Sequence, residues 1–231
     1  MSFIRATIYF SVFTKKSFHS KTTGHIIIRM TRPRRSEQTR EALITAGIDQ
    51  ISKHGYHGTG IKQILDIVSV PKGSFYNFFS SKEAFVAELI KEYSQNTLET
   101  LNTFLLTQGE SLSPVEQLRE IYKFGLSEFA NSQFQKSCLI GSLAADVGAE
   151  SSLCQQALQK AMDKWLGIFS AIFEQAQKVG ELRSDVSARE LSSSYWSTWE
   201  GTLLKLKVTG DVDAAADIME MMLTTFFKAP Q

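Results

Sequence analysis

The sequence predicts an all-α protein with a three-helix head and a larger helical body, about nine helices in total. Apolar residues recur at three- and four-residue steps through most of the chain, as in amphipathic helices. Strand-like alternation never extends beyond a few residues. Only four prolines interrupt the 231 residues, of which 43% are hydrophobic. That composition is sufficient for one or two folded domains.

The first predicted helix of the head runs from Ser36 to His54. Its apolar face is marked by Ala42, Ala46 and Ile51 at helical spacing. Ser36 is suited to the N-cap, and Gly55 to the residue just after the helix, where glycine accepts a left-handed backbone.

Two short helices follow, over residues 61–68 and 72–79. Pro71 cannot continue the first of them but fits the beginning of the second. Two short helices joined by a tight turn form a helix-turn-helix candidate, in which the second helix enters the major groove of DNA. From periodicity alone, an ordinary helical hairpin with an aromatic core explains the segment about as well.

The body begins with a long helix from Lys82 to Leu106, which Ser80 and Ser81 can cap. A linker that contains Gly109 and Pro114 separates it from the remaining helices. Those are predicted over Pro114–Asn131, Ser137–Val147, Ser151–Val179, Ser187–Val208 and Asp211–Lys228. We therefore divide the chain into residues 31–82, a DNA-binding domain, and residues 83–231, an effector-binding and dimerisation domain.

Charge divides the chain in the same place. Residues 31–82 hold eight Lys/Arg against four Asp/Glu, whereas residues 83–231 hold twelve against twenty. A basic front suits contact with phosphates, and an acidic rear would be repelled by them. Residues 1–30 hold five Lys/Arg and no acid. We expect them to be a disordered basic tail, or the product of a start codon upstream of a true start at Met30.

The third helix carries the residues that suit DNA. Small side chains at Gly73 and Ser74 allow a close approach, and Lys72 can reach an acceptor. Asn77 can pair with adenine, and the hydroxyl of Tyr76 suits a phosphate oxygen.

The same helix has an inward face of Phe75, Phe78 and Phe79. Lys82 opens the following helix, where the helix dipole also favours an anion.

The segment Gly55–Phe85 resembles the N-terminal domain of the TetR/AcrR family of repressors. The match lies in the spacing of Val70, Gly73, Tyr76, Phe79, Lys82 and Glu83. The resemblance adds Thr59 to the DNA-binding set. The sequence departs from the family pattern at Gly60, Leu65 and Val68-Ser69. Its Val70–Tyr76 stretch is similar to the branch that regulates N-ethylmaleimide reductase and acrylate metabolism.

The resemblance implies a homodimer on a palindromic double-stranded DNA operator. The last two helices would form the interface, with two recognition helices about one turn of DNA apart. Each has an apolar stripe, which could equally be core: Leu191, Tyr195, Thr198 and Thr202 on one, and Ile218, Met221, Met222 and Phe226 on the other.

The resemblance also implies an inducer pocket in the body, for which Trp165, Trp196 and Trp199 are candidate lining residues. Cys138 follows Lys136 and opens a helix, two features that lower a thiol pKa and raise its reactivity. In this branch some members sense electrophiles or oxidants through a cysteine here. Lys205 and Lys207 could approach the thiol, and Lys207 matches the branch better. A buried structural cysteine and a non-covalent inducer remain alternatives.

An enzyme is the rival class, and little in the sequence favours it. The four histidines lie within the first 57 residues without metal-ligand spacing, and no phosphate-binding or nucleophile-elbow motif is present. We expect no catalytic residues, no metal and no cofactor. No apolar run approaches the length of a membrane span. Two cysteines suggest reduced thiols and a cytoplasmic protein. Repressor and activator are not distinguished.

Overall fold

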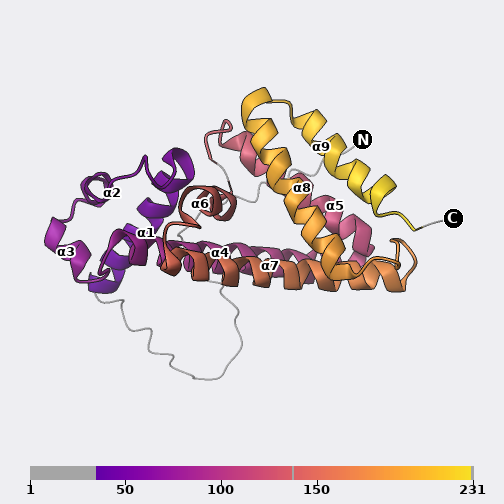
Figure 1. Ribbon diagram of the computed structural model, residues 1–231, viewed down its shortest axis with the longest axis horizontal. Coiled ribbons are helices and arrows are strands. Elements are labelled where there is room, and N and C mark those ends of the chain that lie inside the picture. Colours follow the sequence, from indigo (N-terminus) through magenta and orange to yellow (C-terminus); the bar gives the residue numbers. More distant parts are fainter. Residues whose placement is uncertain (1–34, 137, 230–231) are drawn as a thin grey trace, which may run out of the picture. The chain divides into compact units, whose positions relative to one another are not determined.

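The computed structural model describes residues 35–136 and 138–229, which contain nine α-helices (Figure 1). The all-α prediction is confirmed. The expectations about the N-terminal tail, and about a helix start at Ser137, fall outside the described residues. The helices are α1 (Arg35–His54), α2 (Ile61–Val68), α3 (Lys72–Tyr76), α4 (Lys82–Thr107), α5 (Pro114–Asn131), α6 (Leu139–Val147), α7 (Ser152–Lys178), α8 (Ala188–Thr209) and α9 (Val212–Met221).

The head is built around a cluster of phenylalanine rings. The Phe75 and Phe79 rings lie 5.3 Å apart between centroids, and both contact the ring of Phe85 on α4. Phe75 and Phe79 are buried and Phe78 is half-buried, which confirms the predicted inward face. Aromatic pairs at these separations fix α3 firmly against the rest of the head.

The α3 helix is shorter than predicted, since it ends at Tyr76 rather than Phe79. The amides of Phe78 and Phe79 both donate to the carbonyl of Phe75, at 2.9 and 3.0 Å, which turns the chain out of the helix. This turn places the ring of Phe79 against that of Phe85 on α4. Ser81 then caps α4 by accepting a hydrogen bond from the amide of Ala84, as the sequence suggested.

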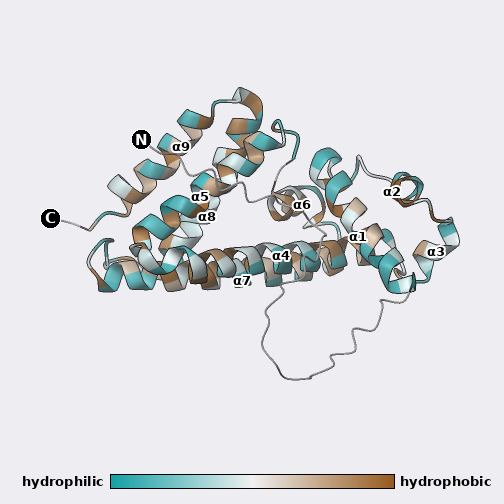
Figure 2. Cartoon of the chain, turned by 180° about the vertical axis from the view of Figure 1, so that it is seen from behind, coloured by the Kyte–Doolittle hydropathy of each residue, from teal (hydrophilic) through white to brown (hydrophobic). Residues whose placement is uncertain are grey.

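Two long helices of the body, α4 and α7, lie side by side (Figure 1). The α7 helix also packs against α8, and α5 packs against both α7 and α9. Figure 2 shows hydrophobic and hydrophilic residues alternating around each helix, the pattern of amphipathic helices that bury one face. In the part of the chain that the structure describes, no helix is long and apolar enough to cross a membrane.

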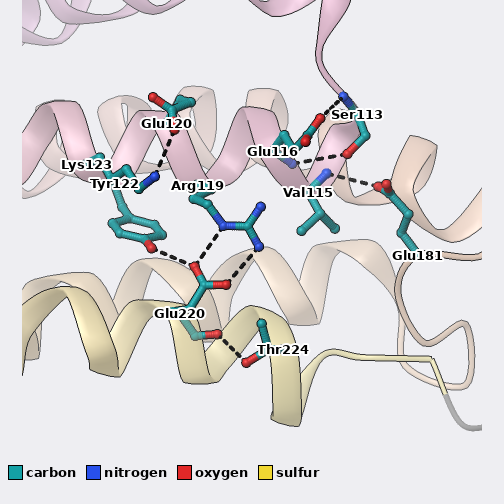
Figure 3. Close-up of polar contacts among 10 residues, drawn as sticks. All are labelled: Ser113, Val115, Glu116, Arg119, Glu120, Tyr122, Lys123, Glu181, Glu220 and Thr224. Atoms are coloured by element: carbon teal, nitrogen blue, oxygen red, sulfur yellow. Dashed lines mark hydrogen bonds and ion pairs between the residues drawn. The ribbon is translucent and has the colours of Figure 1, made fainter. Parts of the chain in front are cut away.

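A charged cluster joins α5 to α9 (Figure 3). The guanidinium of Arg119 donates two hydrogen bonds, each of 2.8 Å, to the carboxylate of Glu220. The hydroxyl of Tyr122 donates a third, of 2.7 Å, to the same carboxylate. These hydrogen bonds lower the pKa of Glu220, and those from Arg119 contribute most. Bidentate pairs of this kind fix geometry as well as charge.

The last predicted helix, residues 211–228, is interrupted. α9 ends at Met221, and one π-helical turn covers Met222–Phe226. The amide of Phe227 reaches back five residues to the carbonyl of Met222. Phe227 is buried, with its ring 5.6 Å from that of Phe173 on α7. The chain then leaves the helix to form a β-bridge between Lys228 and Leu182.

Candidate DNA interface and effector site

The turn between α2 and α3 has the geometry of a helix-turn-helix. Ser69 ends α2 in the left-handed conformation, with φ 58°. The amide of Val70 donates to the carbonyl of Leu65 at 3.2 Å, which closes the end of the helix. Pro71 then provides the N-cap of α3. The sequence departs from the family pattern at this position, and Ser69 adopts a left-handed conformation that glycine takes at lower cost.

Most of the predicted DNA-binding residues share one exposed surface on α3. The side chains of Lys72 and Asn77 are exposed, Tyr76 is 50% exposed, and Ser74 is half-buried. Phe75, on the same helix, is completely buried, and its ring lies 5.3 Å from that of Tyr76. Residues 72–77 therefore expose four polar groups, which are the ammonium of Lys72, the hydroxyl groups of Ser74 and Tyr76, and the amide of Asn77.

Gly73 lies on this surface, and neither its backbone conformation nor its packing requires glycine. Among the residues that the structure describes, no other atom would lie within 4 Å of a Cβ at Gly73, and the backbone of Gly73 is not left-handed. The fold would therefore accept a larger side chain there. The empty space faces outward, and it suits the close approach of a partner from outside the chain.

Lys82 lies beside the surface but partly faces inward. Its Nζ donates a hydrogen bond of 2.6 Å to the carbonyl of Tyr56 and lies 4.1 Å from the centroid of that ring. Burial lowers the pKa of Lys82, and neighbouring Glu83 partly offsets that effect. Lys82 thus ties α4 to the loop before α2. Two of its three N–H donors are left for an anion.

Thr59 was expected to contact DNA, but the structure buries it completely. Its hydroxyl donates to the carbonyl of Gly55 at 2.9 Å, and the carbonyl of Gln50 lies 3.3 Å away. Thr59 therefore secures the loop after α1, and its side chain is not available to a surface partner. Gly60 provides the N-cap of α2 without any side-chain hydrogen bond.

In the body, Cys138 lies where two apolar clusters meet. It is the N-cap of α6 and packs against both the cluster shared with the head and the cluster of α5, α7, α8 and α9. Trp196 packs against the first cluster, and Trp165 and Trp199 against the second. Cys138 is thus the one predicted effector residue that adjoins both clusters, while Lys207 is exposed near the end of α8.

Trp199 lies across Gly125, where a Cβ would come within 2.6 Å of its ring. Trp165 stacks on Phe169, with ring centroids 5.8 Å apart. Both tryptophans are therefore integral to the packing of the body.

The predicted activation of the Cys138 thiol is wrong. Burial raises the pKa of Cys138, and the nearby carboxyl group of Glu200 raises it further. The ammonium of Lys136 does not serve the thiol, because it forms an ion pair of 3.1 Å with Asp49 on α1. Lys207 is exposed in the last turn of α8, about 10 Å along the helix axis from Glu200. The charged group next to the Cys138 thiol is thus the carboxyl group of Glu200 and not the expected ammonium of Lys207.

Glu200 is the residue that the sequence reasoning missed. It lies on α8 within hydrogen-bonding reach of the Cys138 thiol, and its side chain packs over Gly141, where any Cβ would collide with it. Its Oε1 is buried without a hydrogen-bond partner among the described residues. A signal was present in the sequence, because Glu200 follows Trp196 by four residues and so shares its helix face.

Polar contacts join both ends of α6 to the head. Asp146, near its C-terminus, accepts a 2.9 Å hydrogen bond from the amide of Tyr56. His57 contacts the carbonyl of the same aspartate, at 3.2 Å. On the other side, the ion pair between Lys136 and Asp49 joins the loop before Cys138 to α1. The candidate effector site is thus physically continuous with the candidate DNA interface.

The apolar stripe predicted on α8 is core within one protomer. Leu191, Tyr195 and Thr202 are buried among the other helices of the body. Different apolar side chains of the last two helices and the turn after them remain exposed, namely Leu204, Val208, Met221 and Phe226. Two of these, Met221 and Phe226, were expected at an interface. In the described ranges, no group of three or more His, Cys, Asp or Glu side chains could hold a metal ion.

Comparisons with known proteins agree with this architecture. The chain is 32% identical to the transcriptional regulator AcuR of Cereibacter sphaeroides over 168 residues, 73% of this chain and 76% of AcuR. It is 27% identical to the transcriptional repressor NemR of Escherichia coli K12, over 74% of this chain and 85% of NemR. The crystal structure of a regulatory protein TetR from Rhodobacter sphaeroides superposes with a TM-score of 0.74 at 30% identity, covering 80% of this chain and 96% of that one.

Two family models match separate parts of the chain. Residues 43–89 match the bacterial regulatory proteins of the tetR family, and residues 114–222 match the tetracyclin repressor-like C-terminal domain. The first range contains the helix-turn-helix, and the second contains Cys138 and Glu200. With the head, the body and the relatives in agreement, the chain belongs to the TetR family of bacterial transcriptional regulators.

Proposed function

We propose that this regulator is a repressor that binds a palindromic operator as a homodimer, with α3 in the major groove, and leaves it when a small molecule acts at Cys138. The single observation that carries the DNA-binding part is the outer surface of α3. Polar, DNA-compatible side chains stand there around an open glycine, on a base of buried aromatic rings.

Each residue on this surface has a proposed role. Lys72 and Asn77 read base edges, since lysine pairs with guanine and asparagine with adenine. Tyr76 and Ser74 bind phosphate oxygens through their hydroxyls. Lys82 binds a phosphate with the N–H donors that Tyr56 leaves unused. Gly73 leaves room for the DNA backbone or a base.

Substitution of Gly73 tests this placement. Gly73→Leu adds a side chain where the fold has open space, so thermal stability should not fall, while operator affinity should fall at least about tenfold because the side chain enters the interface. Gly167→Leu is the matched control, because Gly167 is another exposed helical glycine with no neighbour within 4 Å. Equal operator affinity for the two variants, measured by fluorescence anisotropy, would contradict the assignment.

The homodimer is proposed from the exposed apolar side chains of α8 and of the segment after it. Leu204 is 70% exposed and Val208 is 87% exposed, values unusual for large apolar side chains close together on one helix. A two-fold interface uses the same patch on both subunits. It would set two α3 helices at the spacing of two operator half-sites.

The effector is proposed to act at Cys138, either by covalent reaction of an electrophile or oxidant with the thiol, or by non-covalent binding next to it. The location supports both, because Cys138 adjoins both apolar clusters and begins the helix that is joined to the head. Displacement of α6 would move the loop at Tyr56 and so the spacing of the recognition helices.

Cys138→Ser separates the two modes of induction. If induction is covalent, the variant should bind the operator normally but stay bound after N-ethylmaleimide or hypochlorite treatment. Full release of the treated variant would rule out the covalent mode. The second mode is tested by adding non-covalent candidate inducers to Cys138→Ala and measuring operator release in a gel-shift assay.

A further inference from the structure

We propose that an open groove where α5, the loop after α7 and the turn after α9 meet is a binding site for a free α-amino acid with an apolar side chain. The groove has a volume of about 380 Å³, which is within the range of small-molecule sites. It lies on other elements than Cys138, which begins α6. The inference therefore does not depend on the proposed role of that cysteine.

Three segments that are far apart in the sequence form the groove. The first turn of α5 lines it, and Glu181 reaches it from the loop after α7. The π-helical turn after α9 contributes Leu223, which is buried, and Thr224, which is exposed. Such turns are rare and occur frequently at functional sites. The irregular end of the last helix thus supports a binding role for this part of the body.

Two carboxylates hold the first turn of α5 and keep one oxygen each for a ligand (Figure 3). Oε2 of Glu116 accepts a 2.9 Å hydrogen bond from the amide of Ser113. Oε2 of Glu181 accepts a 3.1 Å hydrogen bond from the amide of Val115. The Oε1 atoms of both glutamates accept no hydrogen bond from the described residues, and both side chains line the groove. An ammonium group, which carries only donors, is the complementary partner.

Two cationic side chains provide the opposite charge. Glu220 engages Nε and Nη2 of Arg119, but Nη1 forms no hydrogen bond within the part of the chain that the structure describes. Lys228 is exposed, and no hydrogen bond or ion pair links its ammonium to another described residue. Both side chains line the groove. They can donate charge-assisted hydrogen bonds to a carboxylate group of a ligand.

The balance of charge in the groove selects a zwitterion. The lining carries Glu116 and Glu181 on one side of this balance, and Arg119 and Lys228 on the other. Glu116 and Arg119 lie three residues apart on α5 and therefore share one face of the helix. Their neighbouring opposite charges match the ammonium and carboxylate groups that an α-amino acid carries on one carbon. A simple anion or cation would instead be repelled by the groups of like charge.

Apolar side chains complete the lining. Val115 and Leu223 both border the groove, and apolar walls with a few polar groups are typical of ligand sites. We therefore expect leucine, methionine and valine to bind more tightly than glycine, which has no side chain to bury. A regulator with this site would respond to an amino acid in addition to any effector that acts near Cys138.

Isothermal titration calorimetry of the full-length protein with L-leucine tests the site. We expect a dissociation constant of about 1 mM or lower, and glycine should bind more weakly. The absence of saturation up to about 10 mM L-leucine would overturn the proposal. This measurement needs no substitution, so it does not depend on how well a variant folds.

Two analogues test the need for both charges. Isocaproate is leucine without its amino group, and isoamylamine is leucine without its carboxyl group. Each should bind at least about tenfold more weakly than L-leucine, because it leaves one pair of charged side chains without a partner. Equal affinity of isocaproate would reveal a simple anion site, and equal affinity of isoamylamine a simple cation site. Either result would overturn the proposal.

Lys228→Gln and Glu181→Gln locate the amino acid in the groove. Both variants should keep the melting temperature of the unaltered protein, because Lys228 has no partner among the described residues and a glutamine at position 181 still accepts from the amide of Val115. Each should weaken L-leucine binding about tenfold, since one charged hydrogen bond is lost. Lys160→Gln and Glu174→Gln, at exposed positions on α7, are the matched controls and should bind normally. Unchanged affinity in either groove variant would overturn the proposal.

Cys138→Ser keeps this site distinct from the candidate effector site. The variant should bind L-leucine as tightly as the unaltered protein, because Cys138 does not line the groove. Loss of binding in Cys138→Ser would place the amino acid near the cysteine and would overturn the assignment to the groove. Operator binding is not part of this titration, so the proposed function and the amino-acid site can each fail without the other.

Discussion

The backbone N–H of Tyr56 donates a 2.9 Å hydrogen bond to Oδ2 of Asp146. The two residues lie 90 positions apart in the sequence, one in the loop before the helix-turn-helix and the other near the end of α6. Gly55 makes the approach possible, because its left-handed backbone and missing side chain leave space for the aspartate. This contact is the most direct polar link between the head and the helix that Cys138 begins.

Asp146→Ala should therefore lower the free energy of unfolding by about 1–3 kcal/mol, because the part-buried amide of Tyr56 loses its acceptor. Chemical denaturation measures the change. Asp163→Ala is the control, because Asp163 forms only an exposed ion pair with Arg189, and such pairs contribute little. Equal losses of unfolding free energy in the two variants would show that the hydrogen bond from Tyr56 to Asp146 stabilises the fold no more than an exposed ion pair does.

The salt dependence of operator binding reports on Lys82. Each lysine that neutralises a phosphate adds about one unit to the slope of log affinity against log salt. Lys82→Ala should therefore reduce the slope by about one, whereas Lys72→Ala should change the preferred operator sequence instead. Lys82→Ala should also lower thermal stability, because its ammonium binds the carbonyl of Tyr56. An unchanged slope for Lys82→Ala would remove Lys82 from the phosphate contacts.

The exposed apolar side chains of α8 predict the oligomeric state. Leu204→Glu should convert the proposed dimer to a monomer, since two like charges would face each other across a two-fold interface. Sedimentation velocity gives the mass directly. Val179→Glu is a matched control, because Val179 is also exposed (62%) but follows the end of α7. A dimer that survives Leu204→Glu would place the interface elsewhere.

Acid should weaken the junction of α5 and α9 (Figure 3). The pKa of Glu220 is lowered, mainly by the Arg119 hydrogen bonds, so its stabilising effect is complete above the ordinary carboxyl range and is lost as pH falls through the lowered pKa. Glu220→Gln should therefore be less stable than the unaltered protein at pH 7, by about 1 kcal/mol for these part-exposed groups. The difference should shrink toward pH 3. Urea unfolding across this range checks the convergence, and a difference independent of pH would contradict it.

Ser69 offers a stabilising substitution. A side chain in the left-handed region costs about 1–2 kcal/mol, which glycine avoids at the expense of chain entropy. Ser69→Gly should therefore raise the melting temperature by about 1–3 °C. Ser80→Gly, at an exposed site without positive φ, should give no such gain. Calorimetry that ranks the two variants equally would rule out backbone strain at Ser69.

The sequence was sufficient for features that depend on local pattern. Helical spacing, the caps at Gly55 and Ser81, and the inward phenylalanines of residues 72–79 all follow from residues a few positions apart, and the structure agrees with them. The expected N-cap at Ser36 is wrong, because Ser36 lies inside α1, which begins at Arg35. The end of α3 was misjudged, because burial of Phe79 against Phe85 of α4 is a tertiary effect that overrides helical periodicity.

The environment of Cys138 could not be read from its neighbours in sequence. Lys136 is two residues away but is drawn to Asp49 on α1, whereas Glu200 is sixty-two positions away and lies beside the thiol. A pKa depends on what the fold assembles around a group, so sequence proximity gave the wrong sign. The buried stripe of α8 was ambiguous for a related reason, because core and interface residues share the same apolar spacing.

The open space at Gly73 has a consequence for how such regulators diverge. Because no other atom of the described residues lies within 4 Å of a Cβ at that position, a new side chain there changes what the helix meets outside without disturbing what supports it from inside. In the proposed DNA interface, folding and recognition are governed by separate residues of the segment 72–79, with Phe75 and Phe79 serving the first. Under that proposal, selection for a different operator acts on the outer residues alone, so that a lineage acquires new target genes while the scaffold stays the same.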